Sequence, residues 1–187
     1  MTERNIPRYA VCLAALFVAA FLAGLFAPIP GKRDLLRTLM DSFAPVLALP
    51  PWKMFFVILL NNSAKSFAIF LSGILFGLVP LIGIATNGYI LGVAYLFASG
   101  EVGYVQAAKE VLPYGVFEIP AVVIAAAYGL WLGVTFAGRI RRRNLAGFGE
   151  QVLHGIRMFF IIAFPLFLLA AVIETFLIFL MGGSVPV

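Results

Sequence analysis

The fold is decided by residues 53–78, which read KMFFVILLNNSAKSFAIFLSGILFGL. This stretch is long and apolar enough to cross a lipid bilayer as a single helix. Polar residues nonetheless stand near its middle, among them Asn61, Asn62 and Lys65. A lysine at that depth costs about 3 kcal/mol on insertion scales. We therefore expect Lys65 to meet a protein partner or an aqueous cavity.

The polar residues of this segment are not scattered around the helix. At about 100° per residue, one broad face collects Asn61, Asn62, Lys65, Ser66, Ser72, Gly73 and Gly77. The other side is almost wholly Phe, Ile, Leu and Val, with Ser63 the one polar residue outside the polar face. We expect the polar face to look inward onto other helices and the apolar face to look at lipid.

Composition extends this interpretation to the whole chain. Of the 187 residues, 63% are hydrophobic and 11% are charged, and the mean hydropathy is +1.08. Soluble domains carry about 25% charged residues, so the chain is predicted to be an integral membrane protein. Helical segment lengths without strand-like alternation predict an all-α fold in one domain, 1–187. The expected crossings, five in number, are 9–27, 53–78, 81–98, 116–138 and 158–181.

An amphipathic helix is expected over 32–49, between the first and second crossings, because apolar residues recur there at three- and four-residue steps. Pro113 and Pro120 bracket Glu118 and predict a broken or re-entrant start to the fourth crossing.

Small residues indicate where helices approach closely. Gly88 and Gly92 are four apart in the third crossing, a common contact pattern in membranes. A longer series repeats every fourth residue in the fourth crossing and comprises Ala121, Ala125, Gly129, Gly133 and Ala137. We expect these positions, with Gly73 and Gly77, to pack helices together. A homodimer through Gly88 and Gly92, or through any unused part of the 121–137 series, is a further hypothesis.

Charge distribution predicts the orientation. The formal net charge of +5 comes mostly from one cluster near residue 140, which comprises Arg139, Arg141, Arg142 and Arg143. Such clusters mark cytoplasmic loops beside anionic lipid, and nucleic-acid binding is not expected. The prediction is a multi-pass protein of the cell membrane with a cytoplasmic N-terminus.

Further polar residues stand within other crossings, namely Asn87, Glu118 and Glu174. Lys65 is expected to pair with Glu118 or with Glu174, and the spacing does not choose between them. The cluster of Asn61, Asn62, Lys65, Ser66, Asn87, Glu118 and Glu174 has two interpretations. It either holds the bundle together or lines a cavity, head-group pocket or solute path.

Catalysis is not predicted. His154 is the only histidine, and it lacks the Cys or carboxylate spacing of a metal site, so a solvated or interfacial role is expected. Ser63 and Ser66 have no histidine in a plausible register to act as base. Neither a metal nor a cofactor is expected.

Three blocks of sequence carry a family resemblance. The first is Leu60-Asn61-Asn62-Ser63 with Gly73 and Phe76-Gly77, and the second is Asn87-Gly88 with Gly92. The third runs from Leu112 to Ala121, LPYGVFEIPA, followed by Gly129 and Gly133. With these blocks in the family's order and spacing over 52–180, the chain resembles the stage II sporulation protein M family.

The resemblance implies a five-crossing membrane domain with a polar cluster. For sporulating bacteria, the resemblance implies a membrane scaffold that recruits cell-wall hydrolases during engulfment. The family's third block usually reads Pro-His-Gly, whereas Tyr114 stands here at the histidine position. A role that needs a titrating imidazole therefore does not carry over.

Two functions follow as expectations. The first is a non-enzymatic membrane scaffold or assembly factor, and the second is a small transporter, channel or lipid-handling protein that uses the Asn/Lys/Glu cluster. Expected partners are the lipid bilayer, partner membrane proteins and a second copy of the chain.

Overall fold

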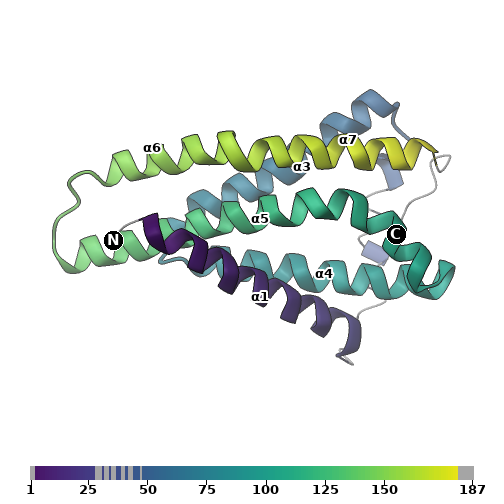
Figure 1. Cartoon of the computed structure of the whole chain (residues 1–187), viewed down its shortest axis with the longest axis horizontal. Helices are drawn as coiled ribbons and strands as arrows, with labels where there is room; N and C mark the ends of the chain where they lie inside the picture. Colours follow the sequence, from purple (N-terminus) through teal and green to yellow (C-terminus); the bar gives the residue numbers. More distant parts are fainter. Residues whose placement is uncertain are drawn as a thin grey trace.

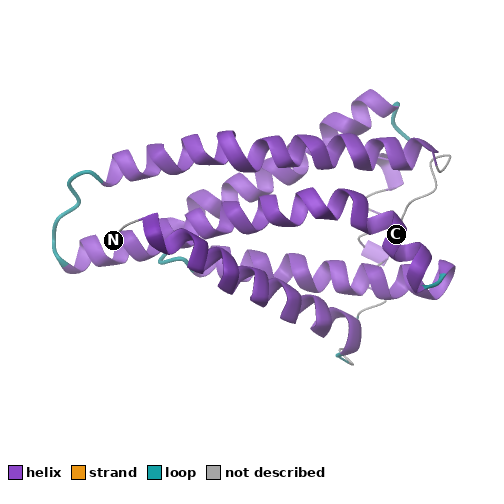
Figure 2. Cartoon of the chain, in the orientation of Figure 1, coloured by secondary structure: helices purple, strands orange, loops and turns teal. Residues whose placement is uncertain are grey.

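The computed structural model describes residues 3–27, 31, 34, 37–38, 41, 44–46 and 48–180. Every element in this part of the chain is a helix and none is a strand (Figure 2), which confirms the predicted all-α class. Five helices are long and apolar enough to cross a membrane. The elements are α1 (Ile6–Phe26), α3 (Pro51–Leu71), α4 (Leu78–Val102), α5 (Tyr104–Arg141), α6 (Phe148–Met158) and α7 (Phe164–Leu180). The amphipathic helix expected over 32–49 lies largely outside the described residues and stays a prediction.

Local sequence sets where these helices begin and end. Pro7 and Pro51 stand in the first turns of α1 and α3, where a missing N–H costs nothing. After α3, a short 3-10 turn over Ser72–Ile74 leads to Gly77, whose left-handed backbone (φ 76°) starts α4. Gly103 (φ 85°) separates α4 from α5. These turns make α3 and α4 an antiparallel hairpin and place α5 directly after it (Figure 1).

Helix α5 is the centre of the bundle. Of the five spans it is the most buried, with 61% of its apolar stretch covered by other helices. It contacts α1, α3, α4 and α7, and Trp131 and Leu132 are almost fully buried on it. The remaining helices surround α5 (Figure 1). Many of their large apolar side chains are exposed, as expected for a protein in lipid.

The start of α5 differs from the expectation. The helix runs without a gap through Pro113 and Pro120, so the predicted broken or re-entrant start is replaced by one long helix. Its amino-terminal turns lie at an angle to the rest (Figure 1). Each proline removes one helical hydrogen bond and favours a kink, but it does not have to end the helix.

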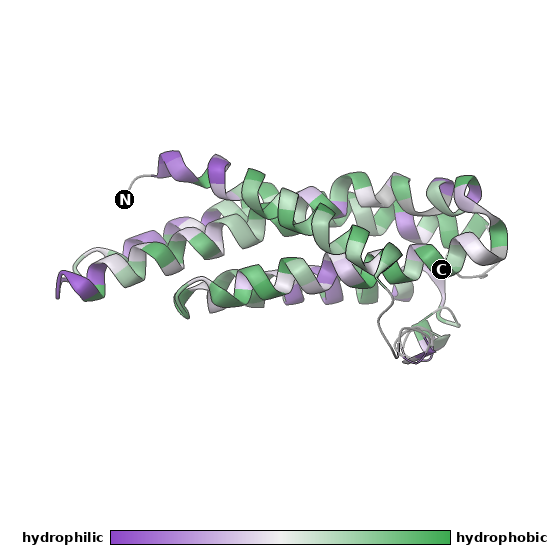
Figure 3. Ribbon diagram, turned by 90° about the horizontal axis from the view of Figure 1, so that it is seen from below, coloured by the Kyte–Doolittle hydropathy of each residue, from purple (hydrophilic) through white to green (hydrophobic). Residues whose placement is uncertain are grey.

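The last crossing is also longer than expected. Helix α6, the π-helical turn Phe159–Ala163 and α7 follow one another without a loop, giving one rod over Phe148–Leu180. Hydrophilic residues gather at the end of the bundle where the N-terminus lies, whereas the middle is mainly hydrophobic (Figure 3).

Glycines hold two pairs of helices at backbone contact. A Cβ atom built on Gly73, in the 3-10 turn that follows α3, would lie 2.0 Å from the Gly129 carbonyl oxygen of α5. On the other side, a Cβ on Gly92 of α4 would lie 2.2 Å from the Phe21 carbonyl oxygen of α1. Gly88 and Gly92 therefore face α1 of the same chain. Eight of the small residues singled out in the sequence are buried, and Ala137, the last of the 121–137 series, is half-buried. The buried ones are Gly73, Gly77, Gly88, Gly92, Ala121, Ala125, Gly129 and Gly133.

Candidate functional site

The predicted polar residues lie mainly where α3 and α4 separate. Near their hairpin the two helices touch, since a Cβ on Gly83 would lie 2.8 Å from Ile69 Cδ1. One helical turn further from the hairpin stand Lys65 on α3 and Asn87 on α4. Beyond that level α3 and α4 diverge, and each packs on other helices instead (Figure 1). Lys65 and Asn87 therefore flank one side of the bundle, with α5 behind them.

Glu118 of α5 also faces the region between α3 and α4. It precedes Gly129 by about three helical turns, so the two residues share a face of α5. That face points between α3 and α4, because a Cβ on Gly129 would meet Phe70 of α3 and Pro80 of α4. In agreement, Glu118 interacts electrostatically with Lys65. We call Asn61, Asn62, Lys65, Asn87 and Glu118 the α3–α4 polar surface.

Glu174 approaches this surface from behind. It lies on α7, which packs against both α3 and α5, and it interacts electrostatically with Glu118. Its Oε2 atom is buried without a hydrogen-bond partner. The structure therefore places one lysine and two carboxyl groups, from three helices, within range of electrostatic interaction. Lys65 interacts with Glu118, and Glu118 interacts with Glu174.

The polar surface is more open than the buried core expected from the sequence. Lys65 and Asn87 are exposed, and Asn61, Asn62 and Glu118 are half-buried, while Ser66 is buried. The buried stripe of α3 runs instead through Leu59, Ser63, Ser66 and Phe70, because α5 and α7 pack on that side. The polar face of α3 lies beside this stripe and only partly overlaps it.

Hydrogen bonds on the surface are local. The Asn61 amide donates to Asn62 Oδ1 at 3.2 Å, and the Asn87 amide donates to the Gly83 carbonyl at 2.8 Å. In the described part of the chain, no carboxylate oxygen lies within 4.0 Å of the Lys65 ammonium. The lysine thus interacts with Glu118 at longer range and keeps its hydrogen-bonding capacity.

The geometry supplies no nucleophile–base pair among the predicted residues. The Ser63 hydroxyl donates to the Leu59 carbonyl at 2.6 Å, a bond within its own helix. Within the described residues, no group of three or more His, Cys, Asp or Glu side chains is placed to hold a metal ion.

His154 has specific neighbours at the end of the bundle near the N-terminus. Its Nε2 atom lies 3.3 Å from Glu3 Oε1, just before α1. Its ring lies 6.4 Å from Tyr128 and 6.2 Å from Trp131, both on α5. The histidine therefore connects α6 with α1 and α5, a contact that sequence spacing does not reveal because the three segments are far apart in the chain.

Arg139 stands apart from the other arginines of its cluster. Its guanidinium donates to the Ala146 carbonyl and to Gln151 Oε1 (3.1 Å), and so holds the turn between α5 and α6. Arg141, Arg142 and Arg143 are exposed.

Sequence reasoning missed two buried hydroxyl groups. Thr135 on α5 and Thr175 on α7 are 4% and 8% exposed, and neither Oγ1 atom has a hydrogen-bond partner. A threonine within an apolar helix is a weak signal, since its hydroxyl usually bonds a carbonyl of the preceding turn.

These features define a class of protein, which is a multi-pass helical membrane protein with a polar surface inside its spans. A model of the family described as Stage II sporulation protein M matches residues 13–177. The match covers most of the chain, and the chain belongs to this family. Neither the curated proteins nor the solved structures contain a match to the chain.

Proposed function

We propose that this protein is a non-enzymatic scaffold of the cell membrane that binds a partner membrane protein at the α3–α4 polar surface. Its N-terminus lies in the cytoplasm. The observation that carries the proposal is the exposure of Lys65 within a membrane span, without a carboxylate in contact among the described residues. The family's scaffold role, inferred from the resemblance, agrees with an assembly function.

The Lys65 ammonium group needs a polar contact at its depth in the membrane. An ammonium group facing hydrocarbon costs about 3 kcal/mol on insertion scales. A partner helix with a carboxyl or amide side chain at the same depth removes that cost, because polar side chains hydrogen-bond across membrane helices. Asn87 on the opposite flank offers a second polar contact. The surface is thus suited to another polar membrane helix.

Photo-crosslinking in native membranes tests this proposal. A benzophenone amino acid replaces Asn87 in one variant and Ile82 in another. Ile82 is 65% exposed on a different side of α4, so it serves as the matched control. We expect a discrete crosslinked product at position 87 and not at 82. Its mass distinguishes another membrane protein from a second copy of this chain.

Two lysine variants make the test specific. Lys65→Met is expected to abolish the product, whereas Lys109→Met, at an exposed lysine outside the surface, leaves it unchanged. A product that forms equally at 82 and 87, or that survives Lys65→Met, contradicts the proposal. So does ion or lipid flux through liposomes of the purified protein that Lys65→Met alters, because flux through this surface means transport.

A further inference from the structure

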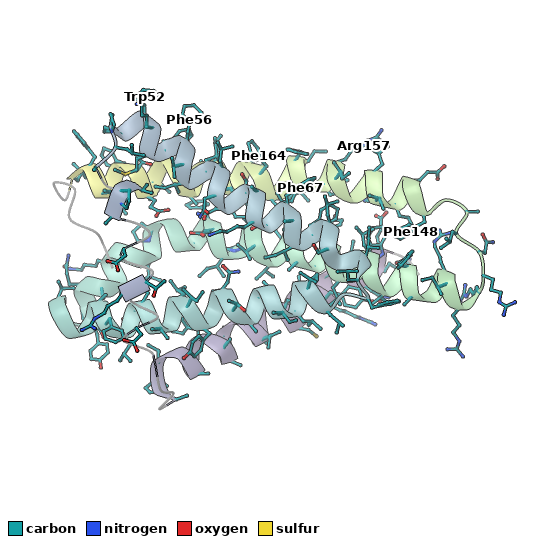
Figure 4. The ribbon with its side chains drawn as sticks, turned by 180° about the vertical axis from the view of Figure 1, so that it is seen from behind. Trp52, Phe56, Phe67, Phe148, Arg157 and Phe164 are labelled. Carbon is teal, nitrogen blue, oxygen red and sulfur yellow. The ribbon has the colours of Figure 1, made fainter. Side chains whose placement is uncertain are left out.

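The short 3-10 turn before α1, Glu3–Asn5, is attached to the α5–α6 end of the bundle through one histidine. His154 stands on α6, whose two ends are marked by the labelled residues Phe148 and Arg157 in Figure 4. The His154 Nε2 atom lies 3.3 Å from Glu3 Oε1. Among the described residues, no other carboxylate comes within 4.0 Å of this imidazole. The pair therefore joins the N-terminal turn to α6.

The histidine half of this contact is enclosed by α5. Its ring centre lies 6.2 Å from that of Trp131, at an interplanar angle of 72°, and 6.4 Å from that of Tyr128. The Nε2 atom is buried and has no hydrogen-bond partner of good geometry. The His154 side chain is 30% exposed, whereas that of Glu3 is 59% exposed. The imidazole is thus held by α5 and α6, and the Glu3 carboxylate is the half that can leave for solvent.

We propose that His154 and Glu3 form a pH-dependent latch for the N-terminal turn. Histidine is the side chain whose charge ordinarily changes between about pH 5 and 8. A hydrogen bond between imidazolium and carboxylate is roughly twice as strong as a neutral one. The latch is therefore closed while His154 is protonated, and it opens as the pH rises and the imidazole loses its charge. Because α1 is held separately by α4, opening releases the turn and leaves the bundle intact.

Neighbouring charges do not replace this pair. The elements that meet at His154 carry further charged or titratable groups, namely Arg4, Arg8, Tyr9, Tyr128, Arg139, Glu150 and Arg157. Of these, Arg4, Arg8, Glu150 and Arg157 are exposed, so salt and water screen them. The Arg139 guanidinium is bound to Ala146 and Gln151, and tyrosine side chains ordinarily keep their charge in this pH range.

Trp131 fluorescence measures the protonation of His154, because an imidazolium close to an indole quenches its emission. The chain has two tryptophans, and Trp52 lies at the opposite end of the bundle (Figure 4). Trp52→Phe therefore leaves Trp131 as the one reporter in the purified full chain. We expect emission to rise between about pH 5.5 and about pH 8, and His154→Gln to remove this change.

A nitroxide at position 4 measures the latch itself. In a Cys12→Ala background, Arg4→Cys is spin-labelled, and the fraction of mobile label is compared over the same pH range. We expect this fraction to rise about two- to fivefold with pH, as fits a partly exposed ion pair. A label at Val105, 70% exposed at the opposite end of the bundle, is the control without a pH response.

Two acid variants separate protonation from latching. Glu3→Gln is expected to keep the pH response of Trp131 and to lose that of the label, whereas Glu150→Gln, one turn away on α6, keeps both. Because Glu3 is largely exposed, Glu3→Gln also decides the test if His154→Gln does not fold. The proposal is overturned by a label that does not respond to pH, by a response that survives His154→Gln or Glu3→Gln, or by its loss in Glu150→Gln.

Discussion

At the scale of single residues, the contact between α5 and the turn that joins α3 to α4 depends on the absence of a side chain at Gly133. A Cβ atom there would lie 2.2 Å from the Gly77 nitrogen and 2.3 Å from the Gly73 carbonyl oxygen. Both are backbone atoms, so no side chain can rotate away. We expect Gly133→Ala to destabilise the protein by about 1–3 kcal/mol through overpacking.

Gly138→Ala is the matched control, because Gly138 lies in the same helix with nothing within 4 Å of a new Cβ atom. It is expected to leave stability unchanged or to raise it by about 0.5–1 kcal/mol through helix propensity. Thermal unfolding in detergent, followed by circular dichroism, compares the two variants. Equal melting temperatures for both would mean that the contact between α5 and the α3–α4 turn tolerates a methyl group.

The sequence predicts these single-residue contacts only in part. The four-residue spacing of small residues identifies positions of close approach, since a helix can reach another backbone only where side chains are missing. It does not identify the opposing helix, because that depends on the turns at Gly77 and Gly103. For Lys65, a helical wheel gives the direction of the polar face of α3 but not which side of α3 the helices α5 and α7 cover. They cover the neighbouring stripe, so Lys65 is exposed, and the sequence alone does not predict this.

At the scale of helices, α1 is attached to the bundle mainly by α4. The attachment is again a backbone contact, with Gly24 and Gly92 facing each other. We expect Gly92→Leu to displace α1, since the new side chain would meet the Phe21 carbonyl oxygen. Gly100→Leu, in the same helix but with open space around it, is the control.

Hydrogen–deuterium exchange of α1 in detergent measures this displacement. Exchange in residues 17–24 is expected to accelerate in Gly92→Leu and to stay at the wild-type rate in Gly100→Leu, because local opening depends on packing. If α1 stays equally protected in both variants, the α1–α4 contact adapts to a larger side chain.

Helix α5 shows why element boundaries are harder to predict than element type. Pro113 and Pro120 are strong local signals for a break, and the chain nevertheless stays helical through both. Neighbouring helices and local adjustments compensate for a missing hydrogen bond in membrane proteins. The crossing itself was predictable because its apolar length is a property of the segment alone, whereas its continuity depends on tertiary packing.

At the scale of the whole molecule, the arginines after α5 are predicted to determine orientation. Arg141, Arg142 and Arg143 are exposed. The side-chain hydrogen bonds of the described α5–α6 turn come from Arg139 and Asn144, whereas Arg142 and Arg143 contribute through their backbone N–H groups, which a substitution keeps. Replacing all three by Gln therefore removes positive charge with little effect on the turn. We expect a population of inverted chains, because Lys and Arg near span ends favour the cytoplasmic side. Replacement of Lys109 by Gln, on the opposite side, leaves the wild-type orientation.

Cysteine labelling on intact cells reads the orientation directly. With Cys12 replaced by Ala, a cysteine at Gly149 reports the α5–α6 end and a cysteine at Val105 reports the opposite end; a side chain at Gly149 meets nothing within 4 Å, and Val105 is 70% exposed. An impermeant maleimide is expected to label position 105 and not 149 in the otherwise wild-type chain. In the triple Gln variant, it is expected to label position 149 as well.

Labelling of 149 alone in the wild-type background means that the N-terminus faces outward. The His154–Glu3 contact and the turn at Arg139 would then lie on the outer side of the membrane, and a partner cytoplasmic domain would have to bind at the opposite end, where α4 meets α5.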